Sequence, residues 1–178
     1  MLKHRKLDNG IDLSILKDLE RVMKHLYLYI WCNKNLLFKL INHYYQRTDI
    51  NLDLITWGKL NPMPTCNNHF LNDCEYCLCI REKNIGLIET ANYEVKKKCY
   101  MTPINQSDKE LYNHPTIKPI EIIKNFILNS SRENDIVLDC FMGSGTTAKM
   151  AKLNNRNYIG FEISKEYCDI AEKRIMEE

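Results

Sequence analysis

No apolar run in this 178-residue sequence is long enough to span a bilayer, and no apolar signal segment follows the basic residues near its start. These absences argue against a membrane-inserted or secreted protein. The formal net charge is only +2, which is too small to indicate nucleic-acid binding by itself. Internal repeats and low-complexity segments are also lacking, and the length predicts a single domain, residues 1–178.

A complete zinc-ligand set is also lacking. Eight cysteines are present, and three of them form Cys74-x-x-Cys77-x-Cys79, but no second Cys/His pair completes a tetrahedral site. Their alternation with apolar residues predicts a strand instead. Cys32, Cys79 and Cys140 sit inside apolar runs, where free thiols pack as small hydrophobic groups. We therefore expect no bound metal and a cytoplasmic, reducing location.

Helical and extended patterns alternate along the chain. Helices are predicted at residues 11–24, 36–44, 120–127, 146–153 and 166–176, and strands at 26–32, 52–57, 75–80, 135–139 and 157–162. The strands at 52–57 and 75–80 are expected to be antiparallel at an edge of the sheet. This alternation predicts an α/β fold, a three-layer Rossmann-like sandwich with a mostly parallel sheet.

The most informative stretch is Asp139-Cys-Phe-Met-Gly-Ser-Gly-Thr-Thr147, which lies between a predicted strand and a predicted helix. Glycines in such a turn let the backbone approach a ligand, and the helix N-terminus offers free N–H groups. The next strand ends near Glu162, 23 residues after Asp139, a spacing that suits a carboxylate bound to ribose hydroxyls. The plainer interpretation is a glycine turn and a surface glutamate.

Two further motifs accompany this loop. His114-Pro-Thr-Ile-Lys-Pro119 precedes it, and Trp57-x-Lys59-x-Asn61-Pro-Met-Pro64 lies earlier in the chain. Together the three motifs resemble those of the DNA methyltransferases that modify adenine N6 or cytosine N4, in the permuted order often called beta. The resemblance covers nearly the whole chain, from about Ile11 to Arg174.

The resemblance implies that S-adenosylmethionine is the cofactor and that residues 114–178 form the cofactor-binding half. Thr116 and Lys118 would supply a hydroxyl and an ammonium group, although the same segment also makes a stiff entry to a helix. The cofactor-binding residues implied by the resemblance are His114, Thr116, Lys118, Asp139, Phe141, Gly143, Ser144, Gly145, Thr146 and Glu162.

The resemblance also implies double-stranded DNA as the substrate. Residues 1–82 would form the target-side half, and residues 83–113 an irregular connection. The residues implied for the target pocket are Trp57, Lys59, Asn61 and Pro62, and of these Trp57 is expected to pack its strand into the core. The glycine loop alone would also be compatible with a protein or small-molecule substrate. The motif Trp57-x-Lys59-x-Asn61-Pro argues against such a substrate, because the resemblance assigns it to the DNA-modifying enzymes.

One motif of the family is missing. These enzymes carry an Asp-Pro-Pro-Tyr-like tetrad that holds the target amino group and stacks on the flipped base. No such tetrad occurs in this sequence, so the catalytic residues stay unknown; Asn61-Pro-Met-Pro64 begins suitably but lacks the aromatic ring. The family places the tetrad after a central strand, between the strands that end at Asp139 and Cys32.

Without that strand, the two flanking strands either pair directly or leave a slot for another polypeptide. We therefore expect a chain truncated at its N-terminus, with an upstream polypeptide as a possible source of the missing strand. The alternative function is a non-catalytic fragment or partner subunit that binds cofactor or DNA without turnover.

Overall fold

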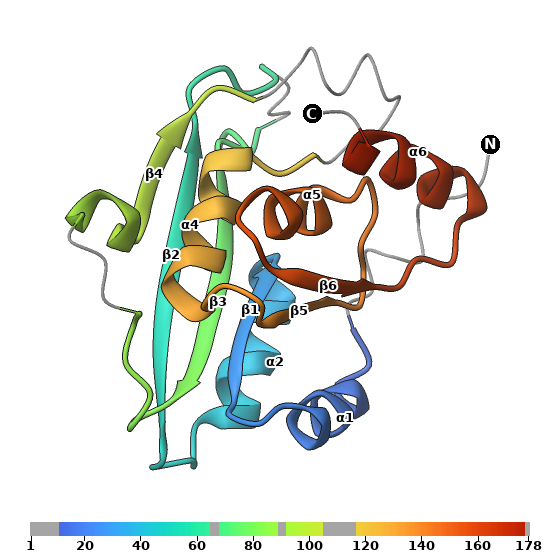
Figure 1. Cartoon of the computed structure of the whole chain (residues 1–178). Coiled ribbons are helices and arrows are strands. Elements are labelled where there is room, and N and C mark those ends of the chain that lie inside the picture. Colours follow the sequence, from blue (N-terminus) through green and yellow to red (C-terminus); the bar gives the residue numbers. More distant parts are fainter. Residues whose placement is uncertain (1–10, 65–67, 89–91, 105–116, 177–178) are drawn as a thin grey trace. The chain divides into compact units, whose positions relative to one another are not determined.

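The computed structural model describes residues 11–64, 68–88, 92–104 and 117–176 (Figure 1). They divide into two compact units. The first comprises the described residues of Met1–Gly58 and Met63–Gly86, and the second those of Lys59–Pro62 and Leu87–Glu178. None of the described helices is long and apolar enough to cross a membrane.

The first unit contains two helices and a sheet. Its elements are α1 (Ser14–Val22), β1 (Tyr27–Cys32), α2 (Lys34–Tyr44), β2 (Ile50–Lys59, whose last residue belongs to the second unit) and β3 (Cys74–Glu82). The side chain of Asn33 caps α2 by accepting a hydrogen bond from the Leu36 N–H at 2.9 Å, which explains where this helix begins. β3 lies between β1 and β2 and is antiparallel to both. The expected antiparallel pair is therefore confirmed.

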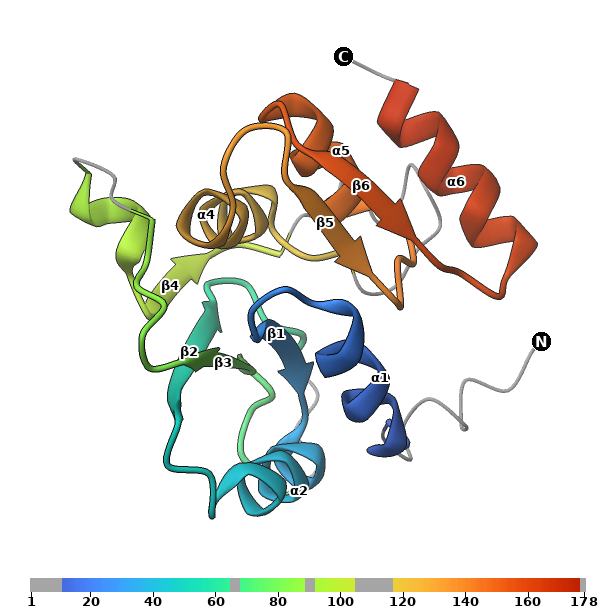
Figure 2. The same cartoon turned by 60° about the horizontal axis from the view of Figure 1, so that its bottom comes forward.

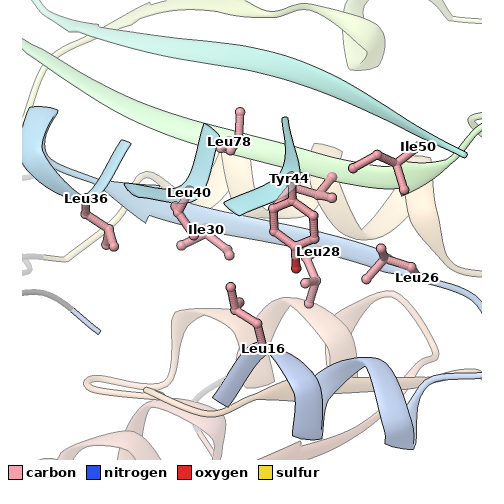
Figure 3. Close-up of a cluster of buried hydrophobic side chains, with 10 residues drawn as sticks. Leu16, Leu26, Leu28, Ile30, Leu36, Leu40, Tyr44, Ile50 and Leu78 are labelled. Atoms are coloured by element: carbon pink, nitrogen blue, oxygen red, sulfur yellow. The ribbon is translucent and has the colours of Figure 1, made fainter. Parts of the chain in front are cut away.

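The core of the first unit lies between one face of this sheet and the two helices (Figure 3). Leu28 and Ile30 of β1 point the same way because strand side chains alternate between faces, and they meet Leu40 and Tyr44 of α2. From α1 the most deeply buried residue is Leu16, at 1% exposure. Val22, the last residue of α1, is 55% exposed, so the buried face of this helix does not extend to its C-terminus.

The second unit follows a helix–strand alternation. Its elements are η2 (Tyr93–Lys96), β4 (Cys99–Thr102), α4 (Ile120–Ser130), β5 (Ile136–Asp139), α5 (Thr146–Leu153), β6 (Asn157–Gly160) and α6 (Lys165–Met176). The segment predicted to be irregular, residues 83–113, thus contains a strand and a 3-10 turn. The Leu60 N–H donates to the Thr102 carbonyl at 3.1 Å, so β4 lies beside the segment that follows β2.

Helix α4 is anchored by polar as well as apolar side chains. Ile122, Ile123, Phe126 and Ile127 are buried, whereas Ile120, expected on the apolar face, is 36% exposed. Asn129 donates to the Val95 carbonyl at 2.5 Å, which ties the end of α4 to η2. The buried amide groups of this helix therefore have a structural use that apolar periodicity did not indicate.

β5 and β6 run side by side in the same direction, with α5 against them (Figure 2). Helices α4 and α6 pack in turn against α5. This is the parallel strand–helix–strand unit that the sequence predicted. The described strands as a whole are mixed in direction, which corrects the expectation of a mostly parallel sheet: β5 and β6 are parallel, whereas β1, β3 and β2 are antiparallel.

The parallel pair is sparsely covered. Parallel strands are usually buried on both faces, but Ile136 is 64% exposed, Ile159 is 47% exposed and Tyr158 is 40% exposed. Among the described strands, β5 pairs with β6 alone and β1 pairs with β3 alone, in separate sheets.

Candidate functional site

The candidate site begins where β5 and β6 end. Their register places Asp139 opposite Gly160, so the turns that follow the two strands leave the same edge. The turn after β5, residues 139–146, is called the cofactor loop below. Its first half is held by two hydrogen bonds: the Phe141 N–H donates to Asp139 Oδ1 at 3.0 Å, and the Met142 N–H donates to the Phe161 carbonyl at 3.0 Å.

Glu162 lies two residues beyond β6 and joins that turn to the cofactor loop. Its Oε2 accepts a hydrogen bond from the Gly143 N–H at 2.9 Å, and its Oε1 accepts one from the Ser164 N–H at 2.9 Å. A carboxylate has about four lone-pair sites, so both oxygens keep the capacity to accept hydrogen bonds from two hydroxyl groups. The geometry thus fits a carboxylate that is already oriented for a diol such as a ribose.

Two glycines allow the loop its shape. Gly143 has φ of 52° and Gly145 has φ of 76°, both in the left-handed region that favours glycine. A Cβ on Gly145 would also lie 2.8 Å from the Cβ of Ala171 in α6. The glycine motif is therefore required by backbone conformation and by close packing within the protein, and these requirements hold without any ligand.

Helix α5 begins directly after Gly145, and no side chain caps its N-terminus. Its first turn contains no acidic residue. A helix start of this kind leaves backbone N–H groups and a partial positive charge for an anionic group. The predicted strand–loop–helix arrangement, with α5 at residues 146–153, is confirmed in its elements.

The hydroxyl groups of the loop are directed toward the protein. Ser144 and Thr146 are 4% and 7% exposed, and both accept hydrogen bonds from Arg174 of α6, at 2.8 and 3.1 Å. They had been proposed as cofactor-binding residues, and the structure places their side-chain oxygens against α6. Phe141 is 59% exposed, so its ring is accessible on the loop surface. Burial raises the pKa of the Cys140 thiol, and the adjacent Asp139 carboxylate raises it further, so this thiol stays protonated near neutral pH.

The His-Pro-Thr-Ile-Lys-Pro motif is only partly visible. His114 and Thr116 lie outside the described residues. Ile117 is 1% exposed, and the partly buried Lys118 precedes Pro119, at which α4 is capped. Residues 117–119 therefore lead into α4, and the role of the motif toward a cofactor remains a prediction.

The residues predicted for the target pocket divide between core and surface. Trp57 is 2% exposed and contacts the ring of Trp31 edge-on at 6.3 Å between centroids, which confirms that it packs β2 into the core of the first unit. Asn61 uses Oδ1 to accept a hydrogen bond from the Ile104 N–H at 2.5 Å. Lys59 and Pro62 are partly exposed on either side of it. Within the described residues, no cluster of His, Cys, Asp and Glu forms a metal site.

Sequence reasoning missed Arg174. The most buried residues of α6 are Ala171 and Arg174, at 0% and 1% exposure, and the adjacent Ile175 is buried as well. The sequence contained one indication that Arg174 is buried: residues 171, 174 and 175 follow the i, i+3, i+4 spacing of a buried helix face. An arginine on such a face indicates an internal polar partner.

Comparisons with known proteins agree with this architecture. The sequence profile described as DNA methylase matches residues 13–173. The chain is 38% identical over 135 residues to the Type II methyltransferase M2.LlaDCHI of Lactococcus lactis subsp. cremoris, covering 70% of this chain and 50% of that protein. It is 63% identical over 68 residues to the Orphan methyltransferase M.BamHII of Bacillus amyloliquefaciens, covering 38% of this chain and 26% of that one.

The chain also resembles solved structures in its fold. The crystal structure of the M1.HpyAVI–SAM complex has a TM-score of 0.75 and 29% identity, covering 98% of this chain and 84% of that one. The cytosine-N4-specific PvuII DNA methyltransferase has a TM-score of 0.73 at 15% identity, covering 93% of this chain and 69% of that one, which shows a shared fold. The chain spans about half the length, or less, of the curated relatives it matches. On the match over residues 13–173, this chain belongs to the DNA methylase family of N6 and N4 methyltransferases, with their Rossmann-like fold.

Proposed function

We propose that the chain binds S-adenosylmethionine at the cofactor loop and takes part in methyl transfer to an exocyclic amino group, adenine N6 or cytosine N4, of double-stranded DNA. The observation that carries this proposal is the hydrogen bond from the Gly143 N–H to Glu162 Oε2, which joins the glycine loop to the acid after the next parallel strand. The family match and the similarity to a structure described as a SAM complex support it.

Each part of the site has a definite task in this proposal. Glu162 accepts hydrogen bonds from the two ribose hydroxyls, and the loop backbone together with the start of α5 receives the methionine part. His114, Thr116 and Lys118 contribute polar groups from the segment before α4. When bound, S-adenosylmethionine supplies a methyl group activated by a sulfonium centre.

DNA is the substrate that the target-side motif favours. In this proposal Lys59 meets a phosphate or an extruded base, and its position after a strand end, beside the exposed Asn61 and the partly exposed Pro62, supports that role. Trp57 is buried in the first unit and has no direct contact with DNA in the proposal. The buried free thiols of Cys77 and Cys79 fit a cytoplasmic protein, since such thiols persist in reducing compartments.

The 178-residue chain by itself is proposed to be inactive. It contains no Asp-Pro-Pro-Tyr-like tetrad, so nothing identified in it orients the target amine or stacks the flipped base. Positioning in a near-attack geometry supplies roughly 7–11 kcal/mol of a reaction barrier. A second polypeptide that brings a tetrad on a β-strand would restore this function. The exposed side chains of β5 and β6 support such a partner.

Transfer of labelled methyl from S-adenosylmethionine to mixed-sequence DNA tests this proposal. The purified chain should give no incorporation, and addition of a polypeptide that carries a tetrad-bearing strand should give incorporation that Asp139→Ala abolishes. Incorporation by the chain alone would show that another segment, with Asn61-Pro-Met-Pro64 as the first suspect, performs the tetrad's task. Cofactor binding without turnover, even with the added strand, would favour the alternative of a non-catalytic subunit.

A further inference from the structure

Arg174 is a buried charged residue that forms three hydrogen bonds with the cofactor loop. It is 1% exposed, and its Nη1 lies 2.7 Å from the Ser144 carbonyl, 2.8 Å from Ser144 Oγ and 3.1 Å from Thr146 Oγ1. A guanidinium NH₂ group has two hydrogens, so these three acceptors share them. One terminal nitrogen thus connects both residues that flank Gly145.

Helix α6 reaches the loop through two of its residues. Ala171 and Arg174 are three positions apart, a spacing that places them on the same side of a helix. Ala171 packs against Gly145 so closely that a Cβ on this glycine would lie within 2.8 Å, while Arg174 binds Ser144 and Thr146 on either side. The second half of the cofactor loop is therefore held by α6, and its first half by Glu162 and Phe161 after β6.

We infer that Arg174 is a positioning residue that fixes the conformation of residues 144–146, and hence the backbone groups that meet the cofactor. The inference rests on the proposed function for its link to S-adenosylmethionine. Arg174 itself faces the protein side of the loop, where it binds Ser144 and Thr146, and acts through them. A charged donor in a buried site forms stronger hydrogen bonds than a neutral one, which makes arginine suited to hold a loop whose glycines are conformationally free.

Lysine is an informative replacement. It keeps the positive charge, but its single ammonium group lacks the planar fork that lets arginine hold a fixed geometry. Arg174→Lys should therefore leave the protein folded and loosen the loop. Arg174→Met removes the donors altogether and should loosen it further. Lys152→Met is the matched control, because Lys152 also binds α6, by donating a hydrogen bond to the Ile175 carbonyl at 3.0 Å.

Amide hydrogen exchange of the ligand-free protein gives a readout that a purely structural role would not produce. In Arg174→Lys, exchange in residues 141–147 should accelerate about tenfold or more, since a hydrogen bond to a charged group is worth roughly that factor. Exchange in α4 should stay at the wild-type rate, and Lys152→Met should change neither region. Equal acceleration in the loop and in α4, or none in the loop, would overturn the inference.

Calorimetry with S-adenosylmethionine completes the experiment. Arg174→Lys should bind the cofactor about tenfold more weakly than the wild type, as expected for the loss of roughly one charged hydrogen bond, with Lys152→Met unchanged. If the wild type fails to bind, the proposed function fails, while the exchange data still decide whether Arg174 holds the loop. If Arg174→Lys loosens the loop but binds with wild-type affinity, the inferred link to the cofactor is wrong.

Discussion

Gly145 is the position at which a single methyl group tests the shape of the cofactor loop. Its φ of 76° lies in the left-handed region, and a Cβ would meet the Cβ of Ala171 at 2.8 Å and its Cα at 3.1 Å. The left-handed conformation costs a residue other than glycine about 1–2 kcal/mol, and overfilling a packed site costs about 1–3 kcal/mol. Gly145→Ala should therefore lower the free energy of unfolding by about 2–5 kcal/mol.

Gly86→Ala is a control for Gly145→Ala in the same chain. A Cβ on Gly86 would meet nothing within 4 Å, and Gly86 lies outside the left-handed region. Gly86→Ala should therefore change stability by no more than about 0.5 kcal/mol. The two variants add the same methyl group, so any difference between them reflects the surroundings of each glycine.

Urea unfolding followed by circular dichroism measures both variants against the wild type. The midpoint should fall clearly for Gly145→Ala and stay in place for Gly86→Ala. A variant of Gly145 that also lost affinity for S-adenosylmethionine would connect the loop's conformation to binding. Equal midpoints for the two variants would refute the close packing of Gly145 on α6.

Two further predictions concern pH and DNA. Burial raises the pKa of the Cys79 thiol from 9.0 to about 12, so the folded state keeps a proton that the unfolded chain loses. The stability that this protonated thiol contributes is complete below about pH 9 and is lost toward pH 12, at up to about 1.4 kcal/mol of unfolding free energy per pH unit. The urea midpoint should therefore fall as the pH rises over this range, and it should fall less steeply in Cys79→Ala. A midpoint that does not change with pH would contradict the burial argument. Lys59→Ala should weaken DNA binding and reduce its salt dependence, because a phosphate contact releases counterions; an unchanged slope in a salt titration would remove Lys59 from the interface.

The local pattern of the sequence was sufficient to locate the cofactor loop and the elements around it. Apolar strand residues, paired glycines and the acid after the next strand have local signatures, and the structure places Asp139, Gly143 and Glu162 together. Helix α2 was equally readable, because its apolar spacing continues to Tyr44 and Asn33 caps it. These features depend on neighbours within a few residues, which a sequence displays directly.

Contacts between distant segments were not readable. Arg174 looked like one more charged residue of a surface helix, and its burial depends on Ser144, 30 residues earlier. The direction of β1 was equally hidden, since an apolar strand pairs in either direction and its partner β3 comes more than forty positions later. The directions of the Ser144 and Thr146 hydroxyl groups were hidden for a similar reason. A motif shows which residues are present, but it does not show whether their side chains point toward a cofactor or, as here, toward Arg174.

The central claim is that the cofactor loop and Glu162 together bind S-adenosylmethionine, and calorimetry with Glu162→Ala tests it most directly. The substitution removes the acceptor of the Gly143 N–H and the carboxylate proposed for the ribose. Binding should weaken about ten- to hundredfold, the equivalent of roughly 1.5–3 kcal/mol for a hydrogen bond to a charged group. Glu172→Ala, which removes an exposed acid from α6, should bind like the wild type. Equal affinity of Glu162→Ala and the wild type would contradict the account.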